Sequence, residues 1–170
     1  MLRKPFKILG INPGTRYLGI AIFEEGQLLD WGVKVAKEKW SKQKKEKVIG
    51  TIFKIIEQYT PAAIAVKKLH PAHSSHSLCQ LADEIACLAK RKRLKVHRYS
   101  IDEIKSFFCK DKRINRLKLA EIVCSAYPVL YHELEKEKTS RNLYHLRMFE
   151  AVALGSICFN RLDKCYHVKS

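Results

Sequence analysis

The chain has 170 residues, of which 46% are apolar, and its 33 Lys and Arg against 17 Asp and Glu give a formal net charge of +16. This length fits one domain over residues 1–170, with enough apolar sequence for a core that needs neither disulfides nor a structural metal. Because no apolar run reaches membrane-spanning length and the first residues lack a signal-peptide pattern, we expect a cytoplasmic protein. The six cysteines include no Cys-x-x-Cys pair, so we expect buried thiols rather than zinc ligands.

The first third of the chain predicts three strands joined by tight turns. Apolar residues dominate residues 7–12, 18–23 and 28–35, and the turns between them contain Gly14 and Gly26. A lysine-rich helix is expected over residues 41–59, because its apolar residues recur on one helical face. Pro61 ends this helix, and residues 62–66 are typical of a short buried strand.

The rest of the chain alternates helix and strand. Ser100, followed three residues later by Glu103, has the capping-box pattern of a helix start, and Pro128 marks a helix end. The remaining expected elements are helices over 78–91, 117–127 and 143–162 and a strand over 94–99. This order predicts an α/β fold with a mixed sheet covered by helices.

Positive charge is concentrated in three runs, which cover residues 37–47, 90–98 and 105–118. The first run is equally consistent with a solvated helix start. Three runs in so short a chain favour a nucleic-acid partner, whose affinity would depend strongly on salt. A membrane surface is less favoured, because no run has an opposite face of Trp or Phe.

Four segments in order resemble the RuvC-type Holliday junction resolvases of the RNase H-like superfamily. They are residues 8–22, with the turn Gly-Ile-Asn-Pro-Gly-Thr-Arg, then 61–67, 96–105 and 149–157. The resemblance implies a central sheet of three antiparallel strands followed by two parallel ones. It also implies branched DNA as substrate, a homodimer, and a role in DNA recombination and repair.

The resemblance also identifies four positions where the family carries catalytic carboxylates for Mg²⁺ or Mn²⁺. Here they are Asn12, Lys67, Arg147 and Glu150, whose formal charges sum to +1 instead of −4. Two-metal hydrolysis needs several anionic oxygen ligands. We therefore expect no bound metal, and a structural ion pair in which Glu150 accepts from Lys67 or Arg147.

His70, His73 and His76 have a spacing that fits a metal site on a helix. Pro71 and a Ser-Ser pair indicate a loop or a helix start, and metal-binding histidines usually have acidic partners, so a metal site is disfavoured. The resemblance places His70 where the family has an aromatic residue that probes the junction centre, which implies contact with phosphate or bases. Lys105 and Arg116 align with family residues on the DNA backbone, although solvated surface explains them equally well. The full set of expected nucleic-acid contacts is Arg16, Lys68, His70, His73, Arg91, Arg93, Lys105, Lys112, Arg113, Arg116 and Lys118.

These observations favour a RuvC-like protein that binds branched DNA without metal-dependent cleavage. One alternative is an active junction endonuclease with a rearranged metal site, in which Glu150 acts with Glu24, Glu25 or Asp102. A second is a basic scaffold that binds RNA or an acidic protein.

Overall fold

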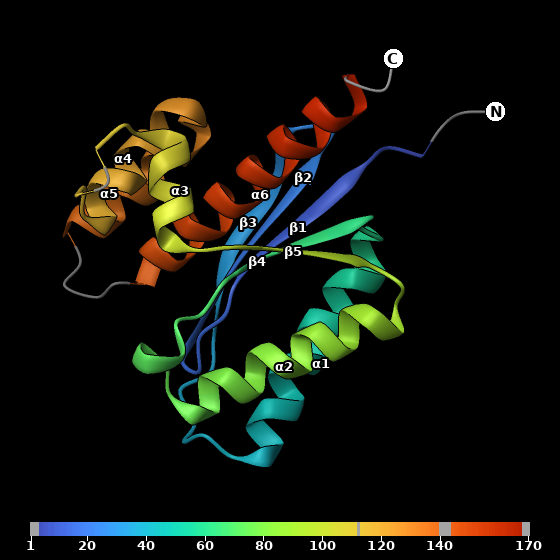
Figure 1. Ribbon diagram of the computed structural model, residues 1–170. Coiled ribbons are helices and arrows are strands. Elements are labelled where there is room, and N and C mark those ends of the chain that lie inside the picture. The colour runs from blue at the N-terminus through green and yellow to red at the C-terminus, as the bar shows by residue number, and fades with distance from the viewer. Residues whose placement is uncertain (1–3, 112, 140–143, 168–170) are drawn as a thin grey trace.

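A five-stranded mixed sheet in the order β3-β2-β1-β4-β5 forms the centre of the protein (Figure 1). The computed structural model describes residues 4–111, 113–139 and 144–167. The strands are β1 (Lys7–Asn12), β2 (Tyr17–Glu24), β3 (Gln27–Val35), β4 (Ala63–Lys67) and β5 (Lys95–Tyr99). The first three pair antiparallel, and β4 and β5 extend the sheet parallel to β1. The predicted sheet is confirmed, and each strand lies within two residues of its expected bounds.

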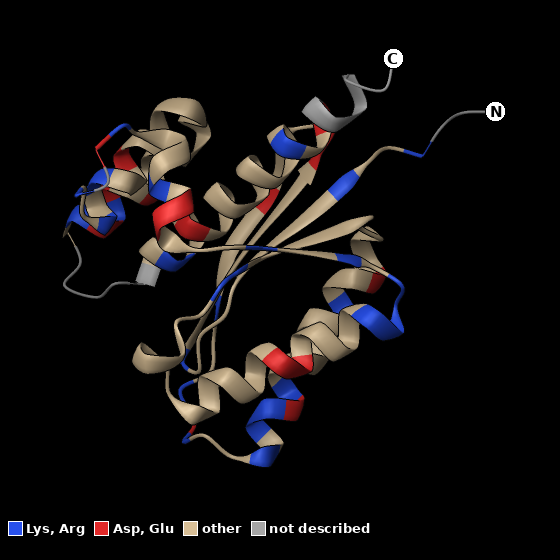
Figure 2. Ribbon diagram, in the orientation of Figure 1, with Lys and Arg blue, Asp and Glu red and all other residues tan. Residues whose placement is uncertain are grey.

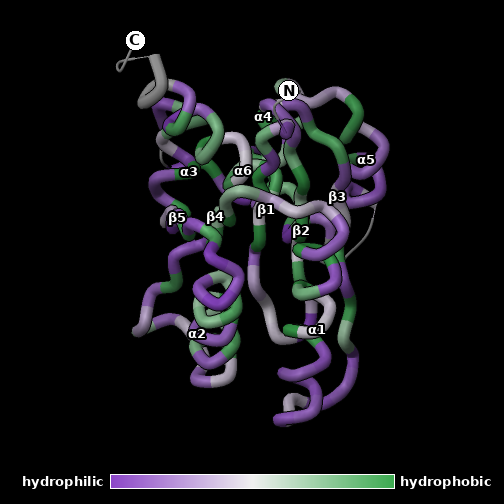
Figure 3. Tube along the Cα trace, turned by 90° about the vertical axis from the view of Figure 1, so that its right-hand side faces the viewer, coloured by the Kyte–Doolittle hydropathy of each residue, from purple (hydrophilic) through white to green (hydrophobic). Residues whose placement is uncertain are grey.

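Helices cover both faces of the sheet (Figures 1 and 3). On one face lie α1 (Lys42–Tyr59) and α2 (His76–Arg91), whose apolar sides enclose one core with the strands. On the other face α6 (Tyr144–His167) crosses the sheet. Around it pack α3 (Ile101–Phe108), α4 (Arg116–Ala126) and α5 (Tyr131–Thr139), which form the second core with α6.

The helix starts follow from local sequence. Ser41 and Ser75 accept from the backbone N–H groups of Lys44 and Leu78, and these bonds fix the starts of α1 and α2. Ser100 and Glu103 form both bonds of the expected capping box at the start of α3.

Helix α5 and two short 3₁₀ turns, Pro71–His73 and Pro128–Leu130, were not expected from the sequence. The α5 sequence is strongly polar, and it buries only Leu134 and Glu137. So few buried positions give no periodic pattern, and tertiary packing is needed to define the helix.

Helix α6 lies unusually close to the sheet because of glycines. A Cβ on Gly10 would lie 2.3 Å from the carbonyl oxygen of Ala151, and one on Gly19 would lie 2.1 Å from that of Arg147. Both contacts are with helix backbone, which cannot move aside. The two glycines therefore set how closely α6 approaches β1 and β2.

The cysteine expectation holds only in part. Cys124 and Cys158 are buried, Cys79 and Cys109 are half-buried, and Cys87 is exposed. Burial raises the pKa of the Cys124 and Cys158 thiols to about 11, so both are neutral near pH 7. Among the described residues, no helix is long and apolar enough to cross a membrane.

Candidate functional site

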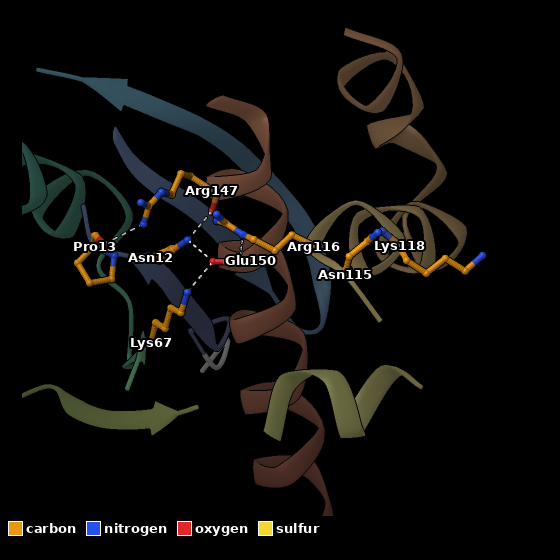
Figure 4. Close-up of polar contacts among 8 residues, drawn as sticks. All are labelled: Asn12, Pro13, Lys67, Asn115, Arg116, Lys118, Arg147 and Glu150. Atoms are coloured by element: carbon orange, nitrogen blue, oxygen red, sulfur yellow. Dashed lines mark hydrogen bonds and ion pairs between the residues drawn. The ribbon is translucent and has the colours of Figure 1, made fainter. Parts of the chain in front are cut away.

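Three of the four family positions meet where neighbouring strands end beneath α6 (Figure 4). Asn12 is the last residue of β1, and Lys67 is the last residue of β4, which runs parallel beside it. Glu150 reaches both from α6. The carboxyl ends of adjacent parallel strands thus gather residues that are far apart in sequence, as in other α/β proteins.

Glu150 is almost fully buried, with 1% of its surface exposed, and both of its carboxylate oxygens are engaged. Its Oε2 accepts from Asn12 Nδ2 at 2.6 Å and from Lys67 Nζ at 3.0 Å. Its Oε1 accepts from Arg116 Nε at 2.7 Å. Burial alone would raise the pKa of Glu150, but the positive charges of Lys67 and Arg116 hold it below its ordinary value. Glu150 is therefore an ionised, charge-compensated carboxylate.

The expected ion pair of Glu150 with Lys67 or Arg147 is confirmed, and Lys67 is the partner. The Arg147 guanidinium turns toward the Pro13-Gly14 turn, where Nη1 donates to the carbonyl oxygen of Pro13 at 3.5 Å. Burial and the nearby positive charge of Arg116 lower the pKa of Arg147. Arg116 thus takes the place expected for Arg147 as the second cation paired with Glu150.

Arg116 reaches the site from the first residue of α4. Asn115 caps this helix by accepting from the backbone N–H of Lys118 at 2.8 Å, which fixes where α4 begins (Figure 4). The Arg116 side chain is 32% exposed and forms a partly buried ion pair with Glu150, and its expected contact with DNA remains a prediction. Sequence spacing did not indicate this role, because 34 residues separate Arg116 from Glu150.

The donor set does not fit a pair of divalent metal ions. Asn12 Oδ1 is buried without a hydrogen-bond partner among the described residues, so one neutral oxygen is available. The single carboxylate is already paired with two cations, and the charges of Lys67, Arg116, Arg147 and Glu150 sum to +2. Among the residues that the structure describes, no group of three or more His, Cys, Asp or Glu could hold a metal ion.

The carboxylates proposed for a rearranged site are poorly placed. Glu24 pairs with Lys7 at the start of β1, and Glu25 follows in the next turn, where it accepts from Phe6 N at 2.7 Å. Asn12 lies at the other end of β1, about 17 Å away along the strand. Asp102 lies in the first turn of α3, exposed. Glu24 and Glu25 therefore cannot act with Glu150, which corrects that expectation.

We call Asn12, Lys67, Arg116, Arg147 and Glu150 the Glu150 cluster. Several expected DNA contacts lie at the same edge of the sheet as this cluster. Arg16 is exposed in the turn after β1, and Lys68 is exposed directly after β4. His70 and His73 are exposed on the following 3₁₀ turn, with ring centroids 4.7 Å apart. His76 contacts Gln80 at 3.1 Å, so these three histidines do not converge on one point.

The remaining expected contacts are divided between two regions. Lys105 lies on α3, and Arg113 and Lys118 are exposed around the start of α4. Lys112 lies outside the described residues. Arg91 and Arg93 lie between α2 and β5, at the amino end of that strand, about 13 Å along the sheet from its carboxyl edge. Figure 2 shows this separation of positive charge.

The sequence profile of the crossover junction endodeoxyribonuclease RuvC matches residues 8–126 of this chain. This chain belongs to the RuvC family. The match covers β1 and β2, β4 with Lys67 at its end, and α4 with Arg116. The family assignment made from the sequence is thereby confirmed.

Known RuvC proteins extend this similarity. A crossover junction endodeoxyribonuclease RuvC from Hydrogenovibrio crunogenus is 29% identical over 107 residues, which cover 59% of this chain and 62% of that protein. Thermus thermophilus RuvC shares the fold with a TM-score of 0.68 at 15% identity, over 93% of this chain and 97% of its own.

Two further solved structures with this fold contain branched DNA. Thermus thermophilus RuvC in complex with Holliday junction substrate has a TM-score of 0.68 at 15% identity, over 92% of this chain and 94% of its own. Fowlpox virus resolvase with Holliday junction DNA has a TM-score of 0.58 at 12% identity, over 91% of this chain and 99% of its own. At these identities the similarity establishes the fold alone.

Proposed function

We propose that this RuvC-family protein binds four-way DNA junctions and does not cleave them by two-metal hydrolysis. Family membership supports the choice of DNA, as does the net charge of +16, which favours a polyanionic partner. We include a homodimer in the proposal, because a four-way junction has a two-fold axis that two equivalent subunits can match. The proposal also treats residues 1–170 as one domain.

The observation that carries the proposal is the environment of Glu150. Its two oxygens accept from Asn12, Lys67 and Arg116, so a metal ion would have to displace these contacts. A unit positive charge and a divalent ion about 4 Å apart repel by about 8 kcal/mol at an effective dielectric of about 20. Two cations beside one carboxylate therefore oppose metal binding strongly.

The same charges favour DNA phosphate. The cluster carries a net charge of +2, and Arg16 and Lys68 are exposed at the same edge of the sheet. Metal ions normally neutralise the phosphate in this fold, whereas here protein cations can do so directly. Such contacts release counterions, and each steepens the fall of log affinity with log salt by about 0.9.

The decisive experiment measures binding and cleavage of a four-way junction together, in Mg²⁺ and in Mn²⁺. We expect the wild-type protein to bind the junction in preference to duplex DNA and to cut neither. The triple variant Asn12→Asp/Lys67→Glu/Arg147→Asp restores carboxylates at the family positions and should gain cleavage if the scaffold is otherwise competent. The same variant with Glu150→Gln is the matched control and should cut nothing.

Three outcomes would overturn parts of the proposal. Wild-type cleavage that Glu150→Gln abolishes would establish an active enzyme with a rearranged site. Tighter binding of RNA than of junction DNA in competition would favour an RNA scaffold. Equal affinity for junction and duplex would remove branched DNA as the preferred ligand.

A further inference from the structure

A hollow of about 270 Å³ lies between the sheet and α2, at the carboxyl ends of β4 and β5. It adjoins the Glu150 cluster through Lys67, which lines the hollow and pairs with Glu150, but its other lining residues do not contact Glu150. Val66 and Val96 form its floor and belong to the core on the α1 and α2 face. Ala82 and Ala86 of α2 form the facing wall, and both are half-buried.

The shape of the hollow follows from these small side chains. Alanine at both α2 positions leaves Val96 half-exposed, whereas Val66 at the base of the hollow is buried. Larger apolar residues at these two positions would close the gap, as they do elsewhere in the core. The hollow is thus an apolar slot with charged residues at its rim and one side open to solvent.

Charged residues surround this apolar slot. Arg98 follows Val96 by two residues, so its side chain leaves the same face of β5. Arg98 and Lys68 are exposed, and Asp83 adds one exposed carboxylate from α2. An apolar slot with two cations and one hydrogen-bond acceptor complements a ligand that has a flat ring, a phosphate and an amino group.

We propose that this hollow binds one nucleotide unit, with the base against Val66 and Val96 and the phosphate at Arg98 and Lys68. The Asp83 carboxylate would accept from an amino group on the base edge. A nucleotide unit reaches the hollow either as a free monophosphate or as an unstacked residue of a DNA strand. The second source rests on the proposed function.

The position of the hollow favours a residue of branched DNA. Val66 directly precedes Lys67, so a strand that contacts the Glu150 cluster passes the mouth of the hollow. Taking a base out of a stack costs a few kcal/mol in paired DNA. Continuous stacking is interrupted where the four arms of a junction meet, which lowers this cost. The branch point of a junction therefore supplies such a base most readily.

The test places the fluorescent base 2-aminopurine at the branch point of a four-way junction and, as a control, within one arm. Fluorescence of this base is quenched by stacking, and no aromatic ring is among the described residues that line the hollow. We expect fluorescence to rise on binding at the branch point only. Junction affinity is measured in parallel by gel shift, which separates failure of this proposal from failure of junction binding.

Two variants and a control probe the hollow itself. Arg98→Ala should weaken dAMP binding by roughly tenfold, because it removes a charge-assisted contact to the phosphate. Ala86→Phe should fill the slot and abolish the fluorescence rise. Lys54→Ala, which removes one exposed charge from α1, should change neither the affinity for dAMP nor the fluorescence rise.

Inorganic phosphate and deoxyribose 5-phosphate distinguish a nucleotide site from a simple anion site. Binding of dAMP but not of either probe supports the proposal. Equal binding of all three would overturn it, as would a fluorescence rise that persists in both Arg98→Ala and Ala86→Phe. Binding of free dAMP without a change at the branch point would assign the hollow to a free nucleotide instead of a DNA residue.

Discussion

Glu150 is a buried carboxylate whose charge is balanced by two cations from different elements. Lys67 is 21% exposed and Arg116 is 32% exposed, so both cations keep partial contact with water while Glu150 does not. If Glu150 were replaced by glutamine, Lys67 and Arg116 would face a neutral buried amide without an anion to balance their charges. The cost of such unpaired charge is the main energetic feature of the site.

We therefore expect Glu150→Gln to destabilise the protein by about 3 kcal/mol at pH 7. The effect should depend on pH. Because the pKa of Glu150 is lowered in the folded protein, its stabilising contribution is complete above the unfolded value of 4.5 and is lost as the pH falls through the folded value. Urea unfolding between pH 3 and pH 7 should show the two proteins converging at the acidic end.

The control for this measurement is Glu46→Gln, at an exposed position on α1. Its effect should remain within about 0.5 kcal/mol at every pH, as is usual for surface substitutions. A constant difference between Glu150→Gln and the wild-type protein down to pH 3 would contradict an ionised Glu150.

Residue identity predicted part of this site and missed the rest. Asn12 and Lys67 each end a buried strand, so their position at one sheet edge could be inferred from the strand pattern. Arg116 could not be placed, because its distance from Glu150 depends on how α4 packs against α6. The direction of Arg147 likewise depends on a contact with the Pro13 carbonyl, which no spacing rule predicts.

At the scale of elements, the contact between α6 and the sheet decides where Glu150 lies. Gly10 on β1 and Gly19 on β2 allow the helix backbone to approach the strands, and Gly155 on α6 leaves room for the ring of Phe23. A shift of α6 by the width of one methyl group would separate Glu150 from Asn12. The glycines are thus part of the site, although they carry no polar side chain.

Gly10→Ala should destabilise the protein by more than about 2 kcal/mol, because the new methyl group would overlap the Ala151 carbonyl oxygen. Gly50→Ala is the matched control, since nothing lies within 4 Å of the added methyl group in the middle of α1. That change should instead stabilise the protein by about 0.5–1 kcal/mol. Thermal unfolding of both variants tests this difference, and equal effects would contradict the close packing of α6.

The helices and strands with strong periodicity could be predicted from the sequence to within about two residues, except that α6 continues to His167, beyond the expected end at residue 162. Helix α5 could not, because its few apolar residues do not form a continuous face. The pairing of α1 with α2 on one face and of α4 with α6 on the other follows from long-range packing. Sequence patterns specify which side of a helix is apolar, and they do not specify which partner covers it.

At the scale of the whole molecule, positive charge lies at two ends of the sheet. Arg16 and Lys68 are exposed at the carboxyl edge of the parallel strands, whereas Arg91 lies at the opposite end. The sequence predicted three basic runs but could not show that Arg91 and Arg93 of one run lie far from the site, whereas Arg98 of the same run lies near it. The topology separates the two groups of cations. Because β4 and β5 are parallel, α2 must return the chain from the carboxyl end of β4 to the amino end of β5, where Arg91 lies.

If junction DNA lies along the carboxyl edge, Arg16→Ala should reduce the slope of log affinity against log salt by about 0.9. Arg91→Ala is the control and should leave that slope unchanged. Fluorescence anisotropy with a labelled junction between 50 mM and 300 mM salt measures both. A reduced slope for Arg91→Ala with none for Arg16→Ala would place the DNA at the other end of the sheet.

We also propose that the two cores unfold together as one domain. Strands β1, β2, β4 and β5 contribute side chains to both cores, and an ion pair joins β4 to α6 across the sheet edge. Guanidinium unfolding should give a single transition, with tryptophan fluorescence and far-ultraviolet circular dichroism coinciding. Two separated transitions would contradict this.

The pairing of Glu150 with Lys67 and Arg116 has a consequence for how such a protein changes over generations. Replacing Lys67 alone by glutamate would set two negative charges side by side, and aspartate at position 12 alone would place a new anion against the buried Glu150 carboxylate. Each of these single substitutions should therefore be less stable than the present protein. The pairing thus disfavours replacement of Asn12 or Lys67 by a carboxylate one residue at a time.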